Sequence, residues 1–554
     1  MTASANNLTT AFTGMLPFII LVAATVTPLL AYLLLRLYRR SVLRAMSRSS
    51  GNIPECVTER PLTAHTATPA TQPLHVSFRT AGAVPDAGPP PIARRVTAVY
   101  ALAGGVFALV MTVATLASAG FEFYPVRLGL VFLVYLWPVF LILYLDGSTT
   151  GRSQLLLFGI YLCVMVALSA VALARSPDLT IAQLATLWLT MNAPAAVITL
   201  AFTWQPVRAI GPLVILFLLV FISGAVLLLA VVGAHDDSLR LAANAGAALG
   251  LGAGGTYAGI ALSGLLLAAF IGWWLLIRVR RAYTAKRIND KSIAVDAVYL
   301  LLGTIHSISL AFEGLAWIAT GLLAFAAYEA TLRFGLRLHP VDTDNTPTSS
   351  RLLLLRVFAL GKRSQQLFHA VTRSWRYRGP IQLIAGPDLA TTTIDPQEFL
   401  EFVSGRLDSL FIGDEPSLAR ALEQLDNAPD FDYRYRVNEF FCHENIWRLA
   451  LSRLVENSDV VLMDLRAFSP DNAGCIFELN ELVARVPLAR VVLATDETTD
   501  RAFLERTLTQ AWQQLGEDSP NANLERPDIQ VVCFEGFSEP QLRGLMGALQ
   551  VASV

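Results

Sequence analysis

Residues 458–482 read SDVVLMDLRAFSPDNAGCIFELNEL, an apolar run that ends in an acid and is followed by a loop and an amphipathic segment. The run VVLM contains no polar residue, as expected for a central strand of a parallel sheet, because helices cover both faces of such a strand. The stretch therefore predicts a strand, a loop and a helix. Asp464 ends the strand, and Glu478 lies near the start of the helix.

The same alternation of short apolar runs and amphipathic segments continues over residues 351–554. It predicts a three-layer, doubly wound α/β domain whose parallel strands are joined by right-handed crossovers. The strands are predicted at residues 351–359, 380–386, 433–440, 459–465, 490–496 and 528–535. In sheets of this kind, ligands bind outside the carboxyl ends of the strands.

The carboxyl ends of four predicted strands carry acids, namely Asp388, Asp464, Asp496 and Glu535. An edge of this composition repels naked phosphate and favours ribose hydroxyls, a cationic base or a metal ion. Each acid also has a simpler explanation, as a turn residue, a loop residue before a helix or a solvated side chain. Asp388 and Asp496 are candidate substrate-binding residues.

The segment YRYRVN at residues 433–438 places Arg434, Arg436 and Asn438 on one face of a predicted strand. Two guanidinium groups on one face can clamp a phosphate or a carboxylate. They can equally form the charged face of an edge strand. These three residues are further candidates for substrate binding.

The unit at residues 459–483 resembles TIR domains, in which the corresponding strand leads to a helix that opens with Cys-x-x-Glu-Leu. It also resembles nucleoside 2-deoxyribosyltransferases, in which a strand ending in Asp precedes Gly-Thr-x-x-Glu-Leu; here Cys475 replaces the threonine. Both resemblances imply a flavodoxin-like sheet and cleavage of an N-glycosidic bond of NAD or a nucleotide. They make Glu478 the catalytic carboxylate, with Asp464 as its partner.

Two features depart from these families. Residues 388–432 contain two predicted helices where a TIR domain has a short loop, and the first strand lacks the usual TIR serine, aromatic and acid pattern. A carboxylate in the first turn of a helix is kept ionised by the positive helix end, and it can stabilise an oxocarbenium-like transition state. The same residue can also be a favourable first-turn acid with no substrate.

The first 350 residues are predicted to be a transmembrane domain. The chain is 54% hydrophobic and only 15% charged, with a mean hydropathy of +0.51. Apolar runs long enough to cross a bilayer recur there, and a longer apolar segment follows at 293–331. The single runs lie at 16–37, 96–119, 128–145, 154–174, 181–203, 210–233 and 256–277. A hairpin of two short spans at 293–331 brings the count to nine, whereas an interfacial helix plus one span would give eight and an external tail.

Arginine clusters follow the first and seventh runs, which the positive-inside rule places in the cytoplasm. The sequence thus predicts a multi-pass protein of the cell membrane with a cytoplasmic C-terminal domain. Residues 38–95 are predicted to form a mobile, Pro/Thr-rich cytoplasmic loop.

Charge and cysteine content restrict the partners. The first 350 residues carry a net charge of +8 and residues 351–554 carry −9, so the tail lacks the basic face that binds nucleic acid. The five cysteines form no metal-binding motif, and no metal or bound cofactor is expected. Three functions fit these patterns: an N-glycosidase that acts on NAD or nucleotides, a non-enzymatic membrane sensor or scaffold whose tail binds nucleotide or forms a homo-oligomer, and a transporter with a regulatory tail.

Overall fold

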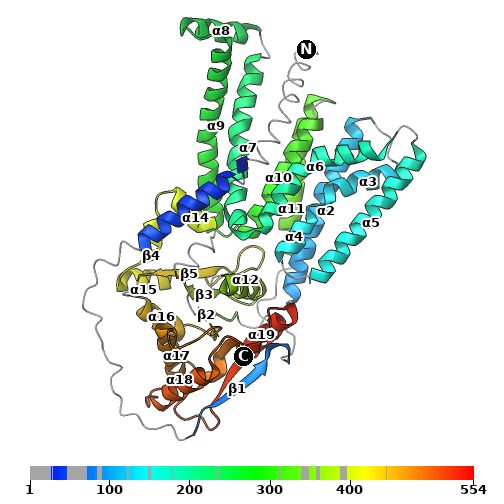
Figure 1. The fold of residues 1–554 in the computed structure, drawn as a ribbon. Helices are drawn as coiled ribbons and strands as arrows, with labels where there is room; N and C mark the ends of the chain where they lie inside the picture. Colours follow the sequence, from blue (N-terminus) through cyan, green and yellow to red (C-terminus); the bar gives the residue numbers. More distant parts are fainter. Residues whose placement is uncertain are drawn as a thin grey trace. The chain divides into compact units, whose positions relative to one another are not determined.

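The structure is a computed structural model of the whole chain, which forms two compact units that are described separately below. One unit is helical, and the other is built around a sheet (Figure 1). The residues described are 26–27, 29–46, 72–83, 90–120, 124–146, 151–176, 179–233, 236–310, 313–338, 349–356, 362–386, 396–443 and 446–553.

The helical unit consists of helices, many of them long and apolar. They are α2 (Pro91–Ser118), α3 (Pro125–Leu136), α4 (Val139–Asp146), α5 (Gly151–Arg175), α6 (Ile181–Thr203), α7 (Gln205–Gly233), α8 (Asp236–Ala248), α9 (Ala253–Thr284), α10 (Asp290–Leu310) and α11 (Thr320–Leu338). Among the described residues, six helical stretches are long and apolar enough to cross a membrane, with α3 and α4 together forming one of them. This confirms a helical domain suited to a membrane. The total of nine spans stays a prediction.

The segment predicted to form a hairpin consists of two helices, α10 and α11. The rings of Tyr299 and Tyr328, one from each helix, lie 4.7 Å apart between centroids. Glu313 lies in the break between the helices, where it is exposed. His306 of α10 hydrogen-bonds through Nδ1 to the hydroxyl of Tyr135 at 3.2 Å, a polar contact between helices.

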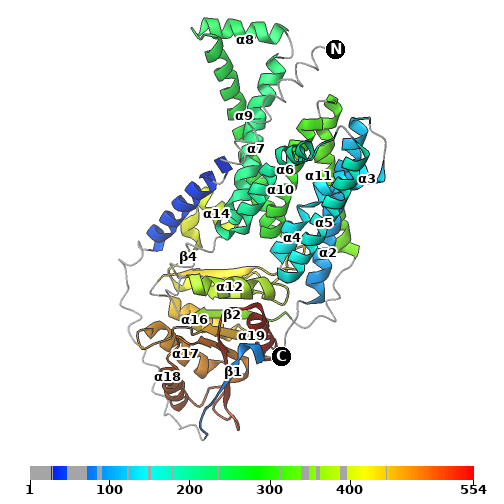
Figure 2. The same cartoon turned by 45° about the vertical axis from the view of Figure 1, so that its right-hand side comes forward.

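Helices α7 and α9 run side by side (Figures 1 and 2) because small residues let their backbones approach. A Cβ atom added to Gly264 of α9 would lie 2.6 Å from the backbone oxygen of Gly224 in α7. The glycine-rich sequence at residues 248–259 therefore serves as a turn and as the start of α9, the second member of a close-packed helix pair.

An eight-stranded parallel sheet forms the centre of the other unit, counting the strands in the described residues. Its strands are β1 (His75–Thr80), β2 (Leu352–Arg356), β3 (Ile381–Ile384), β4 (Phe411–Ile412), β5 (Val437–Cys442), β6 (Val460–Asp464), β7 (Val491–Asp496) and β8 (Asp528–Phe534). Along the chain, helices α12 (Lys362–Trp375), α15 (Glu415–Glu423), α16 (Trp447–Glu456), α17 (Ala473–Arg485) and α18 (Arg501–Gln513) lie between the strands, and α19 (Glu539–Ala552) follows β8. Helix α14 (Pro396–Val403) also falls between two strands in sequence, but its residues up to Leu400 belong to the helical unit. All six predicted strands are present, so the parallel α/β fold is confirmed.

Strand order identifies where the sheet changes direction of winding. The order is β1-β8-β7-β6-β2-β3-β5-β4, and every pair is parallel. Numbered along the chain, the six predicted strands are arranged 3-2-1-4-5-6, the order of dinucleotide-binding Rossmann sheets. A flavodoxin-like sheet has the order 2-1-3-4-5, so this part of the expectation is corrected. The winding reverses between β2 and β6.

Part of the predicted mobile loop is a strand of the sheet. His75–Thr80 form β1, which pairs with β8 from His75↔Asp528 to Thr80↔Cys533. Phe78 packs against the core of the sheet, and the indole nitrogen of Trp512 donates to the carbonyl oxygen of Gln72 at 2.8 Å. The Pro/Thr-rich surroundings concealed a short edge strand whose stability comes from its partner.

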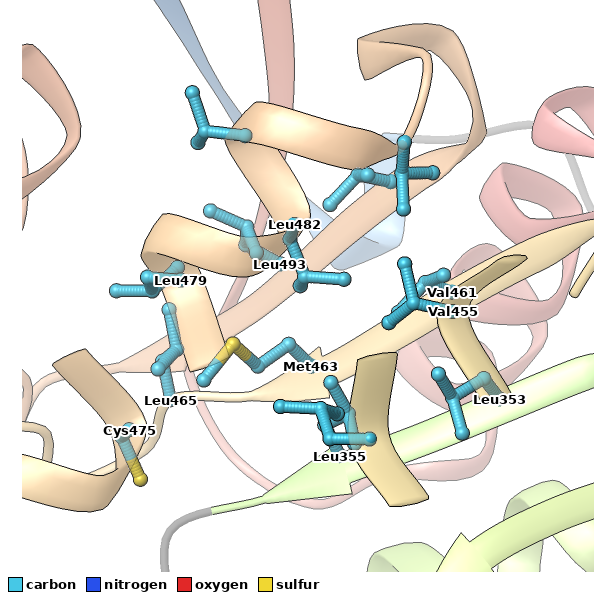
Figure 3. Packing of buried hydrophobic residues seen from close by; sticks show 14 of the residues in the cluster. Leu353, Leu355, Val455, Val461, Met463, Leu465, Cys475, Leu479, Leu482 and Leu493 are labelled. Carbon is cyan, nitrogen blue, oxygen red and sulfur yellow. The ribbon is translucent and has the colours of Figure 1, made fainter. Parts of the chain in front are cut away.

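The helices cover both faces of the sheet. Figure 3 shows the layer in which Leu353 of β2 lies beside Val455, and Met463 of β6 belongs to the same buried cluster as Leu479 and Leu482 of α17. Helices α16 and α18 complete this layer. Helix α19 contacts β6, β7 and α12 on the opposite face. The uninterrupted apolar runs of the sequence are thus explained by burial on two sides.

Candidate functional site

The candidate site lies where β2 and β6 end side by side, at the point where the winding reverses. We call the edge formed by the carboxyl ends of the strands the carboxyl edge, and the opposite edge the amino edge. Arg356, the last residue of β2, pairs in register with Asp464, the last residue of β6. Two charged residues thus end two otherwise apolar central strands. The crevice beside such a reversal is where open α/β sheets bind their ligands.

Asp464 is held by an arginine two residues further along the chain. The Arg466 guanidinium donates from Nε and Nη2 to the two carboxylate oxygens, each at 2.7 Å. Both side chains are almost fully buried, with 2% of Asp464 and 4% of Arg466 exposed. A buried carboxylate in this environment needs such a partner, because removing either charge leaves the other uncompensated.

A second ion pair connects the neighbouring strand end to helix α12. Arg363, the second residue of α12, forms a salt bridge with Asp496 at the end of β7. Asp496 also accepts hydrogen bonds from the backbone and hydroxyl of Thr498. Arg466 Nη2 donates to the backbone oxygen of Arg363 at 2.9 Å, so the two ion pairs form one network.

Glu478 is buried without full hydrogen bonding. Only 2% of the residue is exposed, and its Oε2 atom has no hydrogen-bond partner. Burial raises the pKa of this carboxyl to about 8, although the nearby charge of Arg356 opposes the shift. Helix α17 begins at Ala473, so Glu478 lies in its second turn, and the expectation of a carboxylate kept ionised by the first turn is wrong.

The resemblances made Asp464 the partner of Glu478, but in the structure the two carboxyls have different arginine neighbours. Asp464 interacts with Arg466, and Glu478 lies within the electrostatic reach of Arg356. Both carboxyls are closed to solvent. The adjoining stretches 357–361 and 387–395, which include Asp388, lie outside the described residues.

Arg434, Arg436 and Asn438 are not part of this site. Strand β5 begins only at Val437, so both arginines precede it and lie at the amino edge. Arg436 is buried against Asp430, whose Oδ1 accepts from Nε and Nη2 at 2.8 Å. Asn438 bonds to the backbone of Asp426. Since the strands are parallel, residues that precede one strand cannot meet residues that follow another.

Sequence reasoning missed three arginines of the carboxyl edge, namely Arg356, Arg363 and Arg466. Their signal was position, because Arg356 ends an apolar strand, Arg466 follows one and Arg363 opens a helix. They change the charge of an edge that the sequence presented as acidic. Glu535, by contrast, is exposed beyond β8.

The network combines fixed cations, paired acids and one buried acid at the reversal of winding. It can bind an anion through the exposed part of Arg363, whose side chain is 46% accessible. Helix α12 begins at this position, and helix N-termini favour anions. No group of three or more His, Cys, Asp or Glu side chains suited to a metal ion occurs within the described ranges. Comparison of the chain with protein-family models, curated proteins and solved structures found no match.

Proposed function

We propose that the sheet unit binds a nucleotide at the carboxyl ends of β2 and β6, and that the apolar helices anchor it in the cell membrane with the sheet unit in the cytoplasm. The observation that carries this proposal is the arginine network at the reversal of winding. Arg466 and Arg363 are held in place by acids, while the Arg363 side chain remains partly open to solvent. This is a preformed site for a phosphate group.

The sequence supplies a complementary group for a ribose. In sheets of this order, an acid after the second strand bonds the ribose hydroxyls. When the six predicted strands are numbered along the chain, the second is β3, and Asp388 follows it in the sequence. The chain has no G-x-G-x-x-G loop after β2, so arginine side chains take a larger part in phosphate binding than in typical Rossmann sheets.

Calorimetric titration of the full-length protein in detergent with NAD, ADP-ribose and AMP tests this function. We expect saturable binding that Arg363→Ala weakens about tenfold or more, because a hydrogen bond to a charged group contributes about 1.5–3 kcal/mol. Arg485→Ala is the matched control. Arg485 is similarly exposed (44%) and ion-paired, but it is the last residue of α17 and does not belong to the arginine network. Absence of binding to all three ligands would refute the proposal.

N-glycosidic cleavage is a second candidate function, and the buried Glu478 favours it. A carboxyl with a pKa of about 8 carries a proton at neutral pH and can act as a general acid. With a nucleotide such as AMP, the proton would pass to a ring nitrogen of the departing adenine while the bond between that base and the ribose anomeric carbon breaks. Water would then add to the oxocarbenium-like carbon and release its own proton to the Glu478 carboxylate.

Release of free adenine from AMP by the full-length protein measures this activity, because adenine needs a proton to leave, whereas the nicotinamide of NAD departs as a neutral molecule without one. Glu478→Gln should lower the rate about 10²–10⁴-fold, because it removes the acid at nearly constant volume. Glu456→Gln, at an exposed position of the same unit, should leave the rate unchanged. Nucleotide binding without base release would favour the sensor function over the enzyme.

A further inference from the structure

Phe537 presents an aromatic ring to solvent beside the candidate site. It lies in the connection between β8 and α19, and 39% of it is exposed. Phe534, the last residue of β8, is buried and stacks against it, with ring centroids 6.3 Å apart and planes inclined by 26°. The ring of Phe537 therefore packs against the end of β8.

One side of the ring faces the buried ion pair. The central carbon of the Arg466 guanidinium lies 5.8 Å from the centroid of Phe537, within the range of a cation–π contact. The same guanidinium binds Asp464 through two nitrogens. Phe537 is thus fixed to the ion pair at the end of β6.

Arg466 contacts both Phe537 and Arg363, the residue with the exposed guanidinium. Its Nη2 atom donates to the backbone oxygen of Arg363, whose side chain is 46% exposed. Arg466 therefore contacts the backbone of the residue that carries the partly exposed guanidinium, Arg363, and the partly exposed ring of Phe537. This combination suits a ligand that has an anionic group and a flat ring.

We propose that Phe537 stacks the base of the ligand while Arg363 contacts its phosphate. The inference rests on the proposed nucleotide-binding function and specifies the ligand class as one with an aromatic base, rather than a sugar phosphate. An aromatic side chain can stack any nucleotide base, because every base has a π face. The base lies on the β6–β8 half of the carboxyl edge.

Two probes separate the contributions of base and phosphate. AMP and ribose 5-phosphate share the phosphorylated ribose and differ in the base, so titrating the full-length protein with both isolates the stacking contribution. We expect Phe537→Leu to weaken AMP binding about five- to one-hundredfold and to leave ribose 5-phosphate binding unchanged. Phe537→Trp should retain AMP binding, because it keeps an aromatic face.

Leu524→Ala provides the control, since Leu524 is equally exposed (38%) in another loop of the same unit. Equal weakening of both ligands by Phe537→Leu would overturn the inference, because the ring would then only shield the ion pair. Unchanged AMP binding would also overturn it. Failure of the unmodified protein to bind either probe would instead refute the nucleotide-binding function on which the inference rests.

Discussion

The two edges of the sheet carry similar ion pairs with different surroundings. At the amino edge, Arg436 binds Asp430, whose side chain is fully buried. At the carboxyl edge, Arg466 binds Asp464 in an equally buried pair. The second pair adjoins Arg363, whose side chain is 46% accessible, and Phe537, which is 39% exposed. Beside the first pair lies Asp426, whose side chain is 24% accessible. Buried arginine pairs thus occur at both ends, and the one at the carboxyl edge is accompanied by a partly exposed arginine and a partly exposed aromatic ring.

The difference shows how strand direction sorts charged residues by role. Residues before β5 close the connection that leads into it, so the Arg436 guanidinium stabilises the loop around Asp430. Residues after β6 and β7 meet the N-terminus of α12, where Arg363 is partly exposed. Arginine is therefore buried in the connection before β5, whereas at the carboxyl edge Arg466 is buried and Arg363, at the start of α12, is partly exposed.

The largest predicted effect tests whether the two buried pairs are equivalent. Arg466→Met and Arg436→Met should each lower the free energy of unfolding by about 3–5 kcal/mol, because each leaves a buried carboxylate without its partner. Pulse labelling of the buried thiols Cys475 and Cys533 during urea unfolding of the full-length protein, with mass spectrometry to resolve the sites, measures this change.

Arg485→Met sets the scale for these variants. Its ion pairs with Glu456 and Glu481 are formed by a half-exposed guanidinium, so the expected loss is only about 0–1 kcal/mol. The double variant Asp464→Leu/Arg466→Met should recover most of the stability lost in Arg466→Met, because it leaves no isolated charge. A loss in Arg466→Met no larger than in Arg485→Met would show that the carboxyl edge is more hydrated than its burial indicates.

The sequence contained most of the fold because burial on two faces leaves a strong pattern. Runs such as VVLM in β6 are typical of central strands, and the helices between them are amphipathic. Strand β1 left no such pattern, since its six residues, HVSFRT, are only partly buried. Its position depends on β8, which follows it by more than 400 residues and is invisible to local periodicity.

The site was harder to predict, because its contacts join distant segments. Asp464 and Asp496 were identified from their places after strands, and the structure links them through Arg466 and Arg363. Nothing in the local sequence indicates that residue 363 meets residue 496. The error over Arg434 and Arg436 came from predicting the start of β5 four residues too early, which placed them inside a strand rather than before it.

An intermediate effect concerns Glu478 and its dependence on pH. Its pKa in the folded protein, about 8, lies above the ordinary value of 4.5. The folded state therefore holds this proton more tightly than the unfolded state. The stabilisation is complete below about pH 4.5, is lost as the pH rises and has ended above about pH 8. Each pH unit in this window should cost about 1.4 kcal/mol.

Glu478→Gln should remove that slope. The difference in urea midpoint between the variant and the unmodified protein, measured by the same thiol labelling at intervals from pH 5 to pH 8, should shift in favour of the variant as the pH rises. Glu456→Gln should show no such trend, because Glu456 is exposed. A constant difference across the range would mean that Glu478 is already ionised in the folded state.

The smallest effect extends the comparison to the sheet's outer strand. Asp528 of β8 accepts hydrogen bonds from Ser77 and His75 of β1. Partial burial raises the pKa of Asp528, but these bonds outweigh it and leave the pKa below its ordinary value. A depressed pKa means that the stabilisation is present above the unfolded-state pKa and is lost as the pH falls through the folded-state value.

Asp528→Asn should therefore speed hydrogen exchange of the β1 amides at pH 7 by no more than about fivefold, because the pair is exposed, and leave β6 unchanged. Exchange measured by mass spectrometry and corrected for intrinsic rates should converge for the two proteins in acid. An equal acceleration in β1 and β6 would show that β1 is an integral part of the sheet's cooperative unit, rather than an edge strand that opens separately.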